Sequence, residues 1–201
     1  MRTKKKLLVA LALVCCAILL VAGSIAGTVA YLTSTDKVTN TFTVGKVAIE
    51  MSESKVTEYG VAVDGADPVK ANTYKLLPGH KYQKDPIVTV KDGSEACWLF
   101  VKIENGLSAI EADTNTINAQ IIANGWTALS GEAGVYYMSV AQAEGDQQKE
   151  VFSEFTLAGN ANVSAYGEAQ IVVTAYAIQA DGFSGATAVA DAWTAVSTAH
   201  P

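Results

Sequence analysis

Apolar and polar residues alternate with a period of two along most of the chain after residue 40, and turn-forming residues interrupt this pattern. Successive side chains of a β-strand point to opposite faces, so the alternation predicts short strands, most of them buried on one face. The predicted strands are 41–51, 56–63, 74–77, 87–90, 96–104, 151–157 and 169–179. The last of these is apolar on both faces, as a central strand is.

The clearest alternation runs through the strand at 96–104, which reads ACWLFVKIE. From this strand and the one at 169–179 we predict burial for Leu99, Val101, Ile103 and Val173. Cys97 shares the first three residues' face, so we expect a buried thiol and not a nucleophile. The three tryptophans have apolar neighbours and are predicted to be core residues: Trp98, Trp126 and Trp193.

Two stretches follow a helical period instead. Residues 108–123 predict one or two short helices that stop at Asn124-Gly125, and residues 185–199 predict an amphipathic helix with Val189, Trp193 and Val196 on one side. Seven or eight short strands with few helices, no internal repeat and no linker indicate an all-β fold. We predict a single two-sheet β-sandwich domain over residues 31–201, with short decorating helices.

The N-terminus has the layout of a secretory signal peptide over residues 1–30. Four basic residues and no acid lie within residues 1–6, and an apolar run and a small-residue zone follow. Cleavage is predicted after Ala30, which makes Tyr31 the first mature residue, and Ala26 ends a competing site. The alternative is an uncleaved anchor, because residues 7–32 are long enough to cross roughly 30 Å of hydrocarbon.

Removal of residues 1–30 leaves ten basic residues against 20 acidic ones. Such a negative surface repels phosphate and argues against nucleic-acid binding. We expect a secreted protein of the extracellular matrix or cell surface, which meets the membrane only through an uncleaved signal. Cys97 is the one cysteine after residue 30, so no intrachain disulfide can form and packing alone must hold the fold.

Motifs for catalysis are lacking. The only histidines are His80 and His200, and no metal-ligand spacing, nucleophile elbow or phosphate-binding glycine loop occurs. Ser52 and Lys55 match S-x-x-K without a partner motif. We therefore expect no enzyme, no cofactor and no metal site.

Two weaker patterns carry little chemistry. Asp64, Asp67 and Asp113 lie in turn-like stretches, where they cap the backbone, and neither stretch matches an EF-hand. Asn162-Val163-Ser164 is a glycosylation sequon, which has meaning only in a host that modifies it.

Three stretches together resemble a known family. Gly27-Thr28-Val29-Ala30-Tyr31-Leu32-Thr33, continuing into Asn40-Thr41-Phe42-Thr43-Val44-Gly45-Lys46-Val47, is similar to the signal junction and first strand of the TasA/camelysin family. Leu77-Pro78-Gly79-His80-Lys81 with the strands at 86–104 resembles its Pro-Gly turn and next strand pair. Residues 172–181 resemble its closing strand. The three cover about a third of the mature chain.

This resemblance implies a jelly-roll-like sandwich, matured by a signal peptidase of the SipW type. It implies a structural subunit of biofilm matrix fibres that assembles with itself and with other matrix components. Residues 31–50 would form an exchangeable strand that adds to a neighbouring subunit. The assembly residues implied are Phe42, Val44, Gly45 and Val47. His80 stands where the family has Asp, and protease activity is not carried over, because the ligand spacing is absent.

Other interpretations remain open from the sequence. Residues 41–51 are also consistent with an ordinary first strand of their own domain. The function alternative is a monomeric cell-surface binding module for a polysaccharide or a cation, and a secreted hydrolase is a third.

Overall fold

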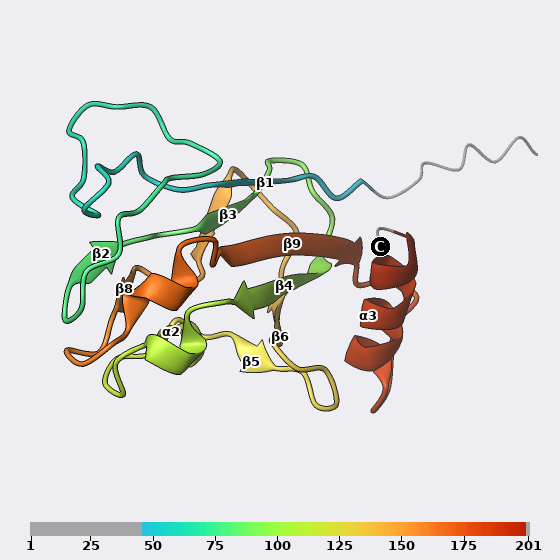
Figure 1. The fold of residues 1–201 in the computed structure, drawn as a ribbon. Coiled ribbons are helices and arrows are strands. Elements are labelled where there is room, and N and C mark those ends of the chain that lie inside the picture. Colours follow the sequence, from blue (N-terminus) through green and yellow to red (C-terminus); the bar gives the residue numbers. More distant parts are fainter. Residues whose placement is uncertain (1–45, 200–201) are drawn as a thin grey trace, which may run out of the picture. The chain divides into compact units, whose positions relative to one another are not determined.

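The computed structural model describes residues 46–199, which are mostly β-structure with a few short helices (Figure 1). Their strands are β1 (Ile49–Ser52), β2 (Lys81–Gln83), β3 (Ile87–Val90), β4 (Cys97–Asn105), β5 (Thr127–Ala128), β6 (Val135–Val140), β7 (Gln147–Glu150), β8 (Glu154–Thr156) and β9 (Ile171–Gln179). The α-helices are α2 (Ile117–Ala123) and α3 (Ala188–Ala199), and two 3-10 helices are η1 (Ser108–Ile110) and η2 (Val163–Tyr166). The predicted β-rich composition with short helices is confirmed.

The strands form three antiparallel sheets in the described part of the chain. Their orders are β1-β3-β7, β2-β8 and β5-β6-β4-β9. The longest ladder joins β4 to β9 over nine positions, from Cys97 opposite Gln179 to Asn105 opposite Ile171. Figure 1 shows these two strands side by side through the middle of the domain.

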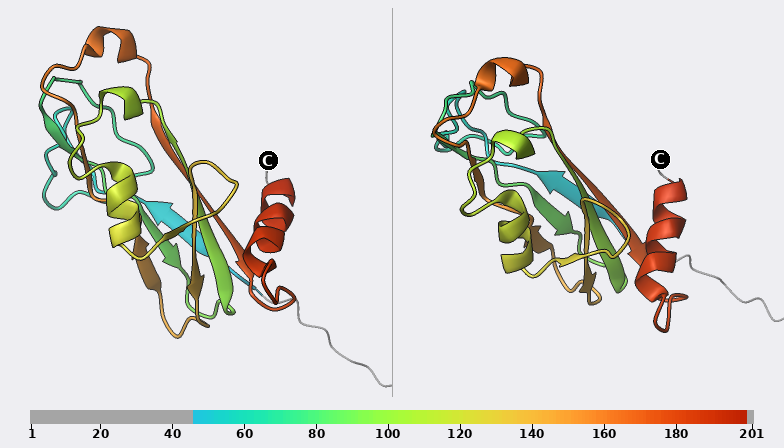
Figure 2. Two further views of the ribbon diagram at one scale, coloured as in Figure 1. Left: turned by 90° about the horizontal axis from the view of Figure 1, so that it is seen from below. Right: turned by 60° about the horizontal axis from the view of Figure 1, so that its bottom comes forward.

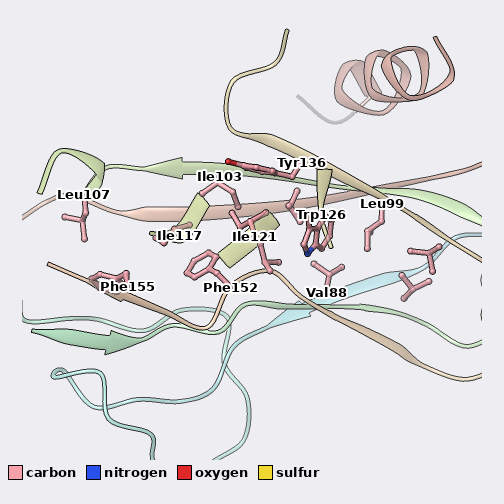
Figure 3. Close-up of a cluster of buried hydrophobic side chains, with 14 of the residues drawn as sticks. Val88, Leu99, Ile103, Leu107, Ile117, Ile121, Trp126, Tyr136, Phe152 and Phe155 are labelled. Atoms are coloured by element: carbon pink, nitrogen blue, oxygen red, sulfur yellow. The ribbon is translucent and has the colours of Figure 1, made fainter. Parts of the chain in front are cut away.

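One face of the four-stranded sheet contributes to the larger of two apolar clusters, which we call the inner cluster. Cys97, Leu99 and Val101 are fully buried in it and Ile103 is 8 % exposed, so the predicted inward face of β4 is confirmed. Val88 and Val90 of β3 and Phe155 of β8 belong to the same cluster, together with Trp126. Figure 3 shows side chains from these strands and from α2 filling one shared interior.

The opposite face of β4 is also apolar, because α3 covers it and forms a second, outer cluster (Figure 2). Phe100 of β4 is fully buried there and lies 5.4 Å from Trp193 of α3, ring centre to ring centre. Ala192 and Val196 of α3 complete the contact. The amphipathic helix predicted from the spacing of Trp193 and Val196 is confirmed, and it begins at Ala188.

The strand predicted at 56–63 is wrong. The chain reverses there, since Gly60 N–H donates to the Thr57 carbonyl at 2.9 Å and Val61 N–H to Thr57 Oγ1 at 3.2 Å. Val61 and Val63 are exposed, so their alternation does not reflect burial. Only an isolated bridge between Val56 and Ala62 remains of the predicted strand.

The strand predicted at 74–77 is also wrong, because a side chain takes the place of a partner strand. The Tyr82 hydroxyl accepts from Leu77 N–H at 2.6 Å and donates to the Lys75 carbonyl at 2.8 Å. The strand predicted at 151–157 shrinks to β8. Four strands went unpredicted. β2 and β5 are only three and two residues long, the apolar residues of β6 do not alternate cleanly, and β7, with the sequence QQKE, is entirely polar.

Candidate functional site

Among residues 46–199, β9 has an open edge, because it pairs only with β4, at the end of the four-stranded sheet. Ile103 N–H donates to the Gly134 carbonyl at 2.8 Å, away from β9. In an antiparallel ladder its opposite residue, Val173, must then direct its N–H and C=O to the outer edge. By the same alternation the backbones of Ile171, Ala175, Ala177 and Gln179 also face outward.

The inward side chains of β9 pack incompletely. Ile171, Val173, Ala175 and Ala177 lie against the inner cluster but stay only half-buried. The predicted burial of Val173 is therefore wrong, and so is the interpretation of residues 169–179 as a central strand. The physical reason is that no strand of residues 46–199 hydrogen-bonds to the outer edge of β9.

A groove of about 550 Å³ lies beside the first half of β9. Apolar side chains from several segments line it, among them Met51, Tyr74, Leu107, Phe155, Ile171 and Val173. β1 passes on its other side, and Figure 1 shows β1 and β9 running along one another. The groove thus places apolar side chains next to the outward-facing backbone of Ile171 and Val173, and these are the two features that a bound β-strand needs.

One wall of the groove carries a buried polar network. Glu53 accepts from Lys84 Nζ at 2.6 Å through Oε2 and from Asn72 Nδ2 at 2.9 Å through Oε1. Asn72 Oδ1 in turn accepts from Val56 N–H at 3.0 Å. Burial raises the pKa of the nearby Tyr74 phenol well above its usual range, and the carboxylate of Glu53 raises it further.

Sequence reasoning missed both the groove and this network. Glu53 and Lys84 are 31 residues apart, and neither belongs to a recognisable motif. The local sequence gives no signal for this pair, because β1 (IEMS) and β2 (KYQ), which end next to Glu53 and Lys84, are both mixed in polarity. Pairing between distant charges depends on the sheet topology, which a single sequence does not give.

The predicted assembly and processing residues are mostly beyond the described range. Ala30, Tyr31, Phe42, Val44 and Gly45 lie outside residues 46–199. The remaining one is Val47, which is half-buried and packs against the inner cluster of its own chain. It leads directly into β1, which pairs with β3 of the same chain.

Cys97 is a free, fully buried thiol, as predicted. Burial raises its pKa, which lowers its reactivity as a nucleophile. Trp126 and Trp193 are buried, as predicted, whereas Trp98 is only half-buried against the outer cluster.

The described part of the chain contains neither a metal-binding cluster nor a helix able to cross a membrane. Residues 46–199 contain no group of three or more His, Cys, Asp or Glu side chains placed to hold a metal ion. Among the helices of the same residues, none has the length and apolar character to cross a membrane.

Comparison of the chain with protein-family models, with curated proteins and with solved structures finds no match.

Proposed function

We propose that this chain is an exported structural subunit of extracellular matrix fibres. In this proposal a SipW-type signal peptidase frees the N-terminal segment, which adds as a strand to β9 of a neighbouring copy. The sheets form a two-sheet, jelly-roll-like sandwich that the added strand extends. The observation that carries the proposal is that the outer edge of β9 is open among residues 46–199, with half-buried inward side chains and a groove partly lined by apolar residues beside it.

The proposed occupant is residues 31–45 of the next copy. An extended chain of this length spans about 50 Å and exceeds the nine residues of β9. Its pattern fits one buried and one solvated face. Val38, Phe42 and Val44 share one parity, and Thr39, Thr41 and Thr43 share the other. The first set would fill the groove, and the β-branched threonines favour the strand conformation.

Electron microscopy of the purified mature chain, residues 31–201, tests this function. We expect fibres from this chain, and a folded monomer without fibres from a variant that lacks residues 31–44. A synthetic peptide of residues 31–45 should bind that shortened monomer, while the same peptide with Phe42→Asp should not, because a charge in an apolar groove is costly.

Two outcomes would contradict the strand-addition model. Fibres from the shortened variant would show that residues 31–44 are dispensable for assembly. Loss of its β-sheet circular dichroism would show instead that these residues are an ordinary strand of their own domain.

The second candidate is a monomeric cell-surface binding module. The mixed lining of the groove favours it, since Glu53, Asn72 and Lys84 stand beside the apolar residues in the manner of a small-molecule site. A mature chain that stays monomeric by ultracentrifugation, and whose Tm rises when a polysaccharide fragment or a divalent cation is added, would support this candidate.

A further inference from the structure

Three side chains with complementary chemistry meet at the polar wall of the groove. Among the ion pairs of residues 46–199, the one between Lys84 and Glu53 is the most buried, with 12 % and 5 % of the two side chains exposed. At least one partner of each other pair is more than a third exposed. Glu53 also binds the carboxamide of Asn72, so a single carboxylate joins an amine and an amide.

The orientation of the Asn72 carboxamide is fixed by what surrounds it. Its oxygen accepts from Val56 N–H at 3.0 Å, and its nitrogen donates to Glu53 Oε1 at 2.9 Å and to the Ser54 carbonyl at 2.8 Å. A flipped amide would oppose donor to donor and acceptor to acceptor at all three contacts. The carbonyl carbon is therefore polarised by a backbone N–H, and the leaving nitrogen already contacts an acid–base group.

The backbone holds these groups in place. Glu53 and Val69 exchange two backbone hydrogen bonds, at 2.9 and 2.8 Å, which anchor the strand end next to the segment that carries Asn72. On the other side, Lys84 N–H donates to the Ser153 carbonyl at 3.1 Å. Holding the reacting groups in a fixed geometry makes their reaction effectively unimolecular. An amide exchange can then become fast enough to occur inside a protein without a separate enzyme.

We propose that the chain joins Lys84 to Asn72 through an intramolecular amide bond, with Glu53 as the acid–base group. In the first step Lys84 Nζ gives a proton to the carboxylate of Glu53, to which it donates a hydrogen bond at 2.6 Å. The neutral amine then attacks Cγ of Asn72, and the developing oxyanion stays within reach of Val56 N–H.

The remaining steps balance without any added reagent. Glu53 passes its proton to Nδ2 of Asn72, the Cγ–Nδ2 bond breaks, and ammonia leaves. The new Nζ–Cγ bond is an amide, and the proton that Nζ releases returns to Glu53 and then leaves with ammonia as ammonium. One C–N bond forms and one breaks, and nothing is oxidised or reduced. This inference is independent of the proposed fibre function.

Mass spectrometry of the full chain tests the bond directly. Formation of the bond releases one ammonia molecule. We therefore expect the wild-type chain to weigh about 17 Da less than its sequence requires. Trypsin should release residues 71–75 and 82–91 as one cross-linked species, in which Lys84 resists cleavage. Comparison with the E53Q variant removes any dependence on where the N-terminus was processed.

Variants separate the chemistry from folding. E53Q keeps the shape of Glu53 and one of its two acceptor oxygens but has no carboxylate to take the proton, so it should show the full mass and two separate peptides. K84M should do the same, because it lacks the nucleophile. K91M is the matched control, since Lys91 pairs with Asp146 at the surface, and it should retain the mass deficit.

The proposal is overturned if the wild-type chain has its full mass and its peptides 71–75 and 82–91 are recovered separately or cut at Lys84. It is also overturned if E53Q and K84M retain the deficit. Neither the intact mass nor the peptide map requires the variants to be stable, because both are measured on denatured protein.

Discussion

Ile103 of β4 and Val173 of β9 face each other in the ladder, but within residues 46–199 only Ile103 has a backbone partner on its far side, the Gly134 carbonyl at 2.8 Å. The outward N–H groups of Val173, Ile171 and Ala175 have no backbone partner among residues 46–199. Backbone donors of β9 thus divide by parity. Even-numbered residues bond to β4, and odd-numbered ones face the open edge.

This parity predicts opposite effects for proline at adjacent positions. Ala175→Pro removes an outward N–H and should leave the monomer folded, because proline is tolerated on the free side of an edge strand. It should nevertheless abolish fibre growth. Thr174→Pro removes a bond to β4, leaves the facing carbonyl without its donor and should destabilise the domain by about 1–3 kcal/mol. Urea unfolding and electron microscopy of both variants check this, and fibres from Ala175→Pro would contradict the assigned edge.

The inward face of β4 should not accept a charge. Val101 is fully buried in the inner cluster, so Val101→Asp would bury a carboxylate without a partner and should unfold the domain. Val172→Asp is the control, because that residue of β9 is 37 % exposed and points away from the interior. Thermal unfolding followed by circular dichroism measures both, and a normal Tm for Val101→Asp would refute the core assignment.

Gly60 combines a left-handed backbone with a close approach. Its φ is +72°, and an added Cβ would lie 2.6 Å from Tyr82 Cα. Gly65 has the same φ and no atom near its Cβ position, so it separates the two effects. Gly65→Ala should cost about 1–2 kcal/mol for the left-handed conformation alone. Gly60→Ala should lower the free energy of unfolding by more, because Tyr82 must also move. Equal losses in the two variants would show that Gly60 does not lie this close to Tyr82.

Alkaline solution should weaken the fold. Burial raises the pKa of the Cys97 thiol and of the Tyr74 phenol above their ordinary values of 9.0 and 10.0. The unfolded chain therefore loses these protons first. The stability they contribute is fully present below about pH 9 and declines as the pH rises toward the folded-state pKa values. Urea titrations at several pH values above 8 should show this decline, with a smaller slope in Tyr74→Phe.

The sequence predicted the elements with regular periods and missed those set by their neighbours. β3, β4 and α3 were predicted because each has a period of 2 or 3.6 residues, and β9 was predicted because it is a nearly continuous apolar run rich in β-branched residues. β7 has no apolar residue and is a strand only because β3 offers it a ladder. Residues 56–63 alternate like a strand but lack a partner, so local turn bonds prevail.

The candidate site was less accessible than the fold. The sequence shows that residues 169–179 are apolar on both faces, but this pattern is shared by a central strand and by an edge strand that awaits a partner. Only the sheet order distinguishes the two cases. The contact of Glu53 with both Asn72 and Lys84 likewise arises from three segments that the topology brings together.

The division of the tryptophans between the two apolar clusters gives this protein built-in optical reporters. Trp126 lies in the inner cluster and Trp193 in the outer one, under α3. With the other two tryptophans changed to phenylalanine, the emission of the one that remains follows a single layer as the temperature rises. Coincident melting curves would mean that α3 and the sheet beneath it unfold as one cooperative unit, and an earlier transition at Trp193 would mean that the helix detaches first.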